Sequence, residues 1–345
     1  MMKNRYDSIT WIRSVAILFV VLGHATAVFD TTWGGTSQIN CFPLAMLCRV
    51  IKTFHMPLFM SISGFLYYAK QIEKTKTSTD FRCGFFDFFK KKVYRLLVPL
   101  ILVKVFWVAP VRYFSGFYDS DNRKAQLLEC IFNPDVGHLW FLYVLFSIFM
   151  IQSIISFFYK DSRNRLIIAT ALAGIIGYFA MISGIPNQIA NILKYNYFFM
   201  LGEIIFLLYQ DKVKVKVKKY MRYLMIAVIA LFTVLLTRNI IQTRWIKILL
   251  EFFVASMDIV AIHTFFEEML KRGVKMPRIF SVLADYSMGI YLFHEPILYF
   301  VLSQISTINP YGLCLVLFGS GLILSMLITM ALRKIGLNIV LGEKC

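Results

Sequence analysis

The chain has 345 residues, of which 59% are hydrophobic and only 16% are charged. A soluble protein of this length would carry about a quarter charged residues, so the composition excludes a soluble globular chain and indicates a polytopic membrane protein. The net charge of +18 does not indicate nucleic acid as a partner, because the basic residues gather in alternate loops, which is the positive-inside pattern of membrane proteins.

The first predicted span, residues 9–29, contains two polar interruptions, Arg13 and His24. They are eleven positions apart, so a helix would place them on nearly the same face, about 16 Å apart along its axis. Polar residues inside a membrane helix usually face the bundle interior or a wet cavity, so this face predicts a polar cavity. The alternative is that Arg13 snorkels to the cytoplasmic surface while His24 only bonds a neighbouring helix.

The next segment, residues 42–53, is predicted to lie along the outer interface and to lead into a second span at 54–70. The small residues Ser61, Ser63 and Gly64 in that span predict close contact with another helix. The third span follows a basic run in which Lys92 and Arg95 are three positions apart and are predicted to share a face.

Further along the chain, His138 precedes the fourth span at its outer boundary, and Trp140 follows two residues later. The alternative for Trp140 and the neighbouring Tyr143 is that they belong to an ordinary belt of aromatic residues at the membrane interface. Glu203 lies in the middle of the sixth span, and a carboxylate there is a functional candidate, although it could only pair with Lys104.

The ninth span carries Tyr291 and His294, three positions apart and therefore on one face, followed by Glu295 and Pro296. The six cysteines show no spacing typical of zinc sites, so no metal is predicted.

These observations predict an all-α polytopic helix bundle of about ten transmembrane helices, organised as one membrane domain over residues 1–345 without a separate soluble domain. Of the 37 Lys and Arg residues, 26 fall in one set of alternate loops and tails, which predicts that both termini are cytoplasmic. The predicted spans are 9–29, 54–70, 96–115, 139–159, 166–183, 194–209, 221–237, 246–266, 282–302 and 311–332.

With these residues in place, the chain resembles the acyltransferase-3 family of integral membrane acyltransferases, and specifically its sugar and polysaccharide O-acetyltransferase branch, such as the fucose O-acetylases. Five features in order carry the resemblance: the Arg13–His24 pair, the segment MPLFMSISGF, the basic pair Lys92 and Arg95, the segment HLWFL at His138, and YLFH at Tyr291–His294. The chain departs from the family pattern at Thr10, where many members carry an acidic residue, and at Ser14, which is often glycine. Lys92 also replaces an arginine, which loses bidentate phosphate geometry.

The resemblance implies a plasma-membrane O-acyltransferase that moves an acetyl or related acyl group from cytoplasmic acyl-CoA to a hydroxyl of a surface polysaccharide or lipid-linked glycan. It implies His24 and Arg13 as catalytic residues, since an imidazole can accept a hydroxyl proton near neutral pH. The substrate-binding candidates are Lys92, Arg95, His138, Trp140, Glu203, Tyr291 and His294.

The expected partners are acyl-CoA, the glycan acceptor and membrane lipid, with polysaccharide-synthesis proteins or a second copy of the chain as further candidates, and no nucleic acid. Two other classes stay open. One is a glycan or lipid transporter or flippase, whose polar residues would line a pathway. The other is a non-catalytic membrane component of a polysaccharide-export complex, in which His24 would be dispensable.

Overall fold

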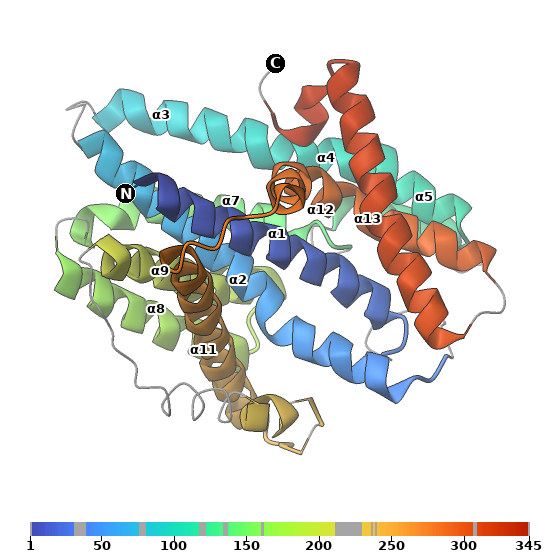
Figure 1. The fold of residues 1–345 in the computed structure, drawn as a ribbon, viewed down its shortest axis with the longest axis horizontal. Helices are drawn as coiled ribbons and strands as arrows, with labels where there is room; N and C mark the ends of the chain where they lie inside the picture. The colour runs from blue at the N-terminus through green and yellow to red at the C-terminus, as the bar shows by residue number, and fades with distance from the viewer. Residues whose placement is uncertain are drawn as a thin grey trace. The chain divides into compact units, whose positions relative to one another are not determined.

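The computed structural model describes residues 2–30, 39–75, 81–116, 122–133, 137–159, 162–210, 230–235, 237–238, 240–305 and 309–343. Within these residues the regular structure is helical, as predicted, and no β-strand occurs among them (Figure 1). The helices discussed below are α1 (Met2–Ala27), α2 (Phe42–Thr75), α3 (Phe81–Lys92), α4 (Val98–Val103), α5 (Ala109–Phe114), α6 (Arg123–Phe132), α7 (Trp140–Tyr159), α8 (Arg163–Ile182), α9 (Asn187–Gln210), α11 (Arg244–Lys271), α12 (Arg278–Gln304) and α13 (Pro310–Lys334).

Among the described residues, six stretches of helix are long and apolar enough to cross a membrane, which agrees with a multi-pass membrane protein. A shorter apolar stretch, Trp140–Ser156, lies within α7. The predicted span 221–237 lies largely outside the described residues, so the count of ten spans stays a prediction. The six stretches are Asp7–Ala27, Phe42–Ile72, Phe85–Phe114, Arg163–Ile182, Asn187–Gln210 and Pro310–Lys334.

The predicted interfacial segment 42–53 and the predicted second span belong to one helix, because α2 runs without a break from Phe42 to Thr75. The interfacial position of 42–53 stays a prediction. No glycine interrupts the sequence between residues 42 and 63, and Pro57 is accommodated inside the helix. The apolar pattern therefore continues through the point where the sequence analysis divided it.

The chain forms two compact units, and α1 and α2 each contribute residues to both. The first unit consists of Met1–Arg13, Lys52–Phe85 and Ser147–Met276, and the second consists of Ser14–Ile51, Phe86–Phe146 and Pro277–Cys345. We describe each unit by itself.

In the first unit, α2 and α9 approach each other closely through small residues. A Cβ atom on Gly64 would overlap the backbone of Phe199, and one on Gly202 would overlap the backbone of Ser61. This confirms the close helix contact that the small residues of the second span predict, since membrane helices gain contact by bringing backbones together.

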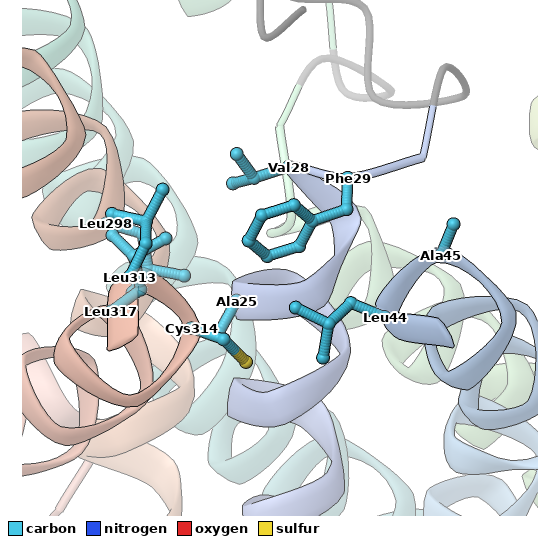
Figure 2. Close-up of a cluster of buried hydrophobic side chains, with 9 residues drawn as sticks. All are labelled: Ala25, Val28, Phe29, Leu44, Ala45, Leu298, Leu313, Cys314 and Leu317. Carbon is cyan, nitrogen blue, oxygen red and sulfur yellow. The ribbon is translucent and has the colours of Figure 1, made fainter. Parts of the chain in front are cut away.

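In the second unit, an apolar cluster joins the C-terminal end of α1 to the start of α2, the end of α12 and the start of α13 (Figure 2). Its buried members are Ala25, Val28, Phe29, Leu44, Ala45, Leu298, Leu313, Cys314 and Leu317. Further along the α12–α13 contact, a Cβ atom on Gly289 would overlap the side chain of Thr329. The cluster therefore holds the end of α1, which carries His24, against α12, which carries His294.

Also in the second unit, α3, α4 and α5 form one long helix that widens twice into π-helical turns, η1 (Val93–Leu97) and η2 (Lys104–Val108) (Figure 1). Pro99 follows η1 and Pro110 follows η2. A proline has no N–H and its ring crowds the carbonyl four residues earlier, so wider turns just before each proline relieve that crowding.

Candidate active site

Three histidines that are far apart in the sequence meet in the second unit, and we call them the histidine cluster: His24, His138 and His294. The ring centroids of His24 and His294 are 5.0 Å apart, those of His138 and His294 are also 5.0 Å apart, and those of His24 and His138 are 6.3 Å apart. They come from the end of α1, the turn before α7 and the middle of α12. The structure thus brings the predicted catalytic histidine together with two of the predicted substrate-binding residues.

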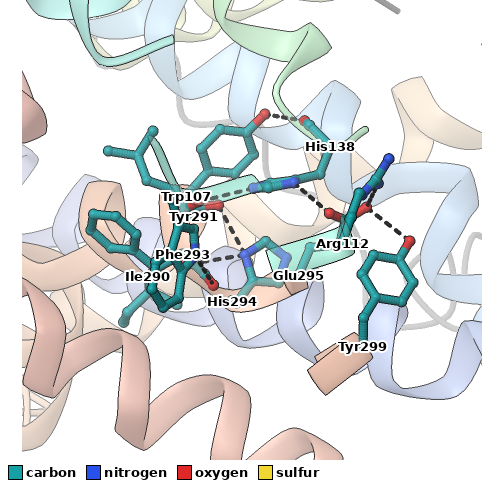
Figure 3. A network of polar contacts seen from close by, with 10 residues as sticks. Trp107, Arg112, His138, Ile290, Tyr291, Phe293, His294, Glu295 and Tyr299 are labelled. Atoms are coloured by element: carbon teal, nitrogen blue, oxygen red, sulfur yellow. Dashed lines mark hydrogen bonds and ion pairs between the residues drawn. The ribbon is translucent and has the colours of Figure 1, made fainter. Parts of the chain in front are cut away.

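A buried carboxylate, Glu295, anchors one side of the cluster (Figure 3). Its Oε1 atom accepts hydrogen bonds from Arg112 Nη2 at 2.6 Å and from the Tyr299 hydroxyl at 3.0 Å. Its Oε2 atom lies 3.0 Å from His138 Nδ1. The Arg112 guanidinium, the Tyr299 hydroxyl and a His138 ring nitrogen thus surround the Glu295 carboxylate. A buried arginine needs a negatively charged partner, and Glu295 is that partner for Arg112.

Three atoms of His138 make polar contacts with residues of α12, and these contacts hold its ring in one orientation. Besides the contact with Glu295, its Nε2 atom lies 3.2 Å from the carbonyl oxygen of Leu292, and its own carbonyl oxygen accepts a hydrogen bond from the Tyr291 hydroxyl. The Leu292 carbonyl is available because Pro296, four residues later, has no N–H to donate to it. Both ring nitrogens therefore face oxygen acceptors, so the geometry suits His138 as a hydrogen-bond donor rather than as the base.

His294 has the opposite arrangement, with one nitrogen engaged and one bare. Its Nδ1 atom lies 2.9 Å from the carbonyl oxygens of Ile290 and of Tyr291, so Nδ1 carries the hydrogen. Its Nε2 atom is buried and makes no hydrogen bond among the described residues. This imidazole is a fixed neutral tautomer whose second nitrogen can accept a proton or a hydrogen bond.

Exposure separates His24 from the other two members. His138 and His294 are 4% and 0% exposed, whereas His24 is only half-buried. His24 is therefore the member of the cluster with the most exposed surface, although its Nδ1 atom is itself buried.

The remaining candidates of the second unit lie elsewhere in it. Trp140 is partly exposed in the first turn of α7, with its ring centroid 6.4 Å from that of Phe141. Lys92 ends α3, where its Nζ atom lies 5.2 Å from the centroid of the Phe88 ring, and Arg95 is exposed on η1. Arg95 precedes Arg112 by 17 residues on one long helix, which is about 25 Å at helical rise. The basic pair and the histidine cluster thus mark opposite ends of this unit.

Two predicted residues belong to the first unit. Arg13 is half-buried on α1, eleven residues before His24. Glu203 is completely buried on α9, and neither of its carboxyl oxygens makes a hydrogen bond of ordinary geometry to a described residue, although the Tyr159 hydroxyl lies close to it. The alternative partner of Glu203 in the sequence was Lys104. This lysine belongs to the second unit, where it donates to the carbonyl oxygen of Asn133 at 2.5 Å. The roles assigned to Arg13 and Glu203 stay predictions.

The sequence analysis missed Arg112 and did not include Glu295 or Tyr299 among its site residues. A signal for Arg112 was present, because an arginine inside the predicted span 96–115 is a functional candidate for the same reason as Arg13. Glu295 directly follows His294, and Tyr299 lies four residues further on the same helical face. Within the described residues, no group of three or more His, Cys, Asp or Glu side chains is arranged to hold a metal ion.

The arrangement has the parts of a proton-transfer site. It holds a reachable imidazole, a second imidazole with a bare nitrogen, and a buried ion-pair group of Arg112, His138 and Glu295 that keeps the cluster in place. Such a group can position a base and place positive charge near a developing oxyanion.

Comparison with known proteins gives a consistent result. Residues 6–333 match the family model Acyl_transf_3, described as an acyltransferase domain. The nodulation protein NolL of Sinorhizobium fredii is 27% identical over 204 residues, which are 58% of this chain and 48% of that protein. NolL of Mesorhizobium japonicum is 26% identical over 203 residues, with the same shares covered. The match therefore spans about half the length of these curated relatives, and no solved structure matches significantly.

Proposed function

Since the chain belongs to the acyltransferase-3 family, we propose that it is an acyltransferase that moves an acetyl or related acyl group from acyl-CoA to a hydroxyl of a surface polysaccharide or lipid-linked glycan. The observation that carries this proposal is the histidine cluster, in which His24 is partly exposed while His138 and His294 are buried. We place the protein in the plasma membrane, with ten spans and both termini in the cytoplasm.

In the proposed reaction, His24 accepts the proton of the acceptor hydroxyl while that oxygen attacks the thioester carbonyl carbon. The carbon–sulfur bond then breaks, an ester forms, and the proton passes from His24 to the departing CoA thiolate. The group of Arg112, His138 and Glu295 carries one net positive charge when all three are ionised, which favours the negative oxygen that develops on the carbonyl. His294 supports His24 by offering Nε2 as an acceptor.

The donor would approach at the end of the second unit that carries Lys92 and Arg95. CoA phosphates need cations, and Arg95 is exposed there. The separation of about 25 Å between Arg95 and Arg112 suits a donor whose phosphates stay at one membrane surface while its acyl end extends inward.

The direct test is transfer by the purified protein in lipid nanodiscs. Isotope-labelled acetyl-CoA is mixed with glycan taken from cells that lack the gene, and the acetylated product is identified by mass spectrometry. We expect labelled ester on the glycan with wild-type protein and none with His24→Gln. The matched control is His55→Gln, a half-buried histidine of the first unit, which should keep wild-type transfer. Glycan that passes across the membrane without gaining label would favour a transporter instead.

The proposed topology has its own test in intact cells. A cysteine placed at Asn122, in the predicted outer loop between the third and fourth spans, should react with a membrane-impermeant thiol reagent. A cysteine at Lys275, exposed in the predicted inner loop after α11, should not. Labelling of Lys275→Cys from outside would reverse the orientation.

A further inference from the structure

The C-terminal segment of the chain lies against the turn that carries the basic pair. The short 3₁₀ helix η4 (Asn338–Leu341) is followed by Gly342, whose φ of +65° suits glycine and whose position leaves no room for a side chain, because a Cβ atom would overlap the backbone of Arg95. The Tyr94 hydroxyl donates to the carbonyl oxygen of Glu343 at 3.2 Å. The family match ends at residue 333, so this segment lies beyond it.

Glu343 uses its side chain to bind Arg333, the penultimate residue of α13, through two hydrogen bonds. Arg333 Nε lies 2.9 Å from Glu343 Oε2, and Nη2 lies 2.5 Å from Glu343 Oε1. A guanidinium that holds a carboxylate with two parallel bonds also holds a phosphate in the same way. The carboxylate of Glu343 therefore occupies the position that a phosphate group would take on Arg333.

The guanidinium is fixed by other contacts as well, so it does not depend on Glu343 for its orientation. Its Nη2 atom donates to the carbonyl oxygen of Asp285 at 3.0 Å, and its Cζ atom lies 4.6 Å from the centroid of the Tyr286 ring. These contacts would keep Arg333 in place if the carboxylate left.

The Arg333–Glu343 pair is also easy to open. The two side chains are 29% and 34% exposed, and an ion pair at a surface contributes about 0–1 kcal/mol. The ordinary explanation is a surface ion pair with a cation in the last turn of α13, where it favours the helix dipole. That explanation predicts no dependence on any ligand. A preorganised arginine, linked through Glu343 to the turn that carries the basic pair, predicts one.

We propose that Arg333 binds a phosphate group, as a third cation beside Lys92 and Arg95, and that Glu343 occupies Arg333 until that phosphate displaces it. This inference rests on the proposed function for one of the two sources of phosphate, the CoA part of the donor. The other source is the headgroup of an anionic phospholipid at the same membrane surface.

Equilibrium binding separates these possibilities without relying on catalysis. The purified protein in phosphatidylcholine nanodiscs is titrated with acetyl-CoA and with acetyl-pantetheine, which has no phosphate. We expect Arg333→Gln to weaken acetyl-CoA binding by about ten- to a hundred-fold and to leave acetyl-pantetheine binding unchanged. Glu343→Gln should strengthen acetyl-CoA binding, and the double variant should behave like Arg333→Gln alone.

Matched controls show whether a loss is specific. Arg272→Gln removes another exposed arginine that pairs with a glutamate, Glu268, at 2.7 Å, and it should change neither affinity. Arg333→Lys keeps the charge without the bidentate geometry and should lie between wild type and Arg333→Gln. Thermal unfolding of each variant identifies any that fail to fold, and Glu343→Gln tests the idea independently because it predicts a gain.

The lipid arm uses native mass spectrometry of protein extracted from membranes that contain phosphatidylglycerol. If Arg333→Gln leaves acetyl-CoA binding unchanged but loses retained phosphatidylglycerol, the phosphate is that of a lipid and the assignment of Arg333 holds. If Arg333→Gln and Glu343→Gln change neither donor affinity nor lipid retention, Arg333 is a structural residue. Wild-type protein that binds no acetyl-CoA would instead contradict the proposed function.

Discussion

Two buried glutamates, one in each unit, show how differently an apolar helix bundle can carry a carboxyl group. Glu295 in the second unit accepts from Arg112 and Tyr299 and contacts His138, so it forms the centre of an ionic group. Glu203 in the first unit is completely buried, and its surroundings are uncharged polar side chains such as Tyr67 and Tyr159. Both glutamates are buried, but they differ in their partners: Glu295 has an arginine and a histidine beside it, and Glu203 has tyrosines.

The difference teaches where chemistry can be expected in this protein. An ionised carboxylate in an apolar interior needs cationic partners and hydrogen bonds, and once it has them it fixes the groups around it. Glu295 holds His138 beside His24 and His294, so its ionic group lies next to the candidate base His24. The polar side chains around Glu203 bond one another, including Gln152 Nε2 to Asn196 Oδ1 at 2.7 Å, and Glu203 forms no ion pair with a described residue.

The largest effect is expected at the histidine cluster itself. His24→Gln should lower the transfer rate by about 10²–10⁴-fold, because an amide can hold a hydrogen bond but cannot accept the proton. The rate is measured with labelled acetyl-CoA, and binding of acetyl-CoA should persist. Near wild-type transfer by this variant would move the search for a base to His294, whose Nε2 is bare, and would leave His24 as a helix-packing residue.

The next largest effect should follow removal of the charge on Glu295. Glu295→Gln leaves the buried Arg112 and His138 without a carboxylate, which we expect to cost about 3–5 kcal/mol of folding stability. Displacement of the cluster should also reduce transfer by about 10²-fold. Thermal unfolding and transfer assays give the two quantities. The nitrogen chemical shifts of His138 should also change, because Nδ1 loses its carboxylate partner.

A smaller effect is expected at the other end of the second unit. Arg95→Ala should raise the KM for acetyl-CoA by about ten- to a hundred-fold, because a charge-assisted hydrogen bond contributes roughly 1.5–3 kcal/mol. The KM for the glycan should stay unchanged. A fall in glycan affinity with unchanged donor affinity would show that the basic pair is not the donor end.

The smallest effect should come from the first unit. Glu203→Gln keeps the size of the side chain, and with no cation to lose within the described residues we expect a change of less than about 1 kcal/mol in stability and little change in transfer. Melting temperature and rate are compared with those of Glu295→Gln under the same conditions. A large loss of glycan affinity would break the contrast between the two glutamates and support the predicted substrate-binding role of Glu203.

Much of the site followed from local sequence patterns. His24, His138, Tyr291 and His294 were all named as candidates, because a polar residue in an apolar span is conspicuous and because their motifs resemble those of a membrane acyltransferase family. The structure places them together, and their roles stay predictions. The close contact of α2 followed from its small residues for the same reason.

The sequence by itself determined the class of molecule, since hydropathy and helical periodicity depend only on neighbouring residues. Only the tertiary structure decided which polar groups share a site. Arg112 and Glu295 are 183 positions apart, and His138 and Glu295 are 157 apart, so no local pattern pairs them. The contacts of the His138 and His294 rings were decided in the same way, because His138 meets oxygen atoms from another part of the chain and His294 Nδ1 meets carbonyl oxygens of the preceding helical turn.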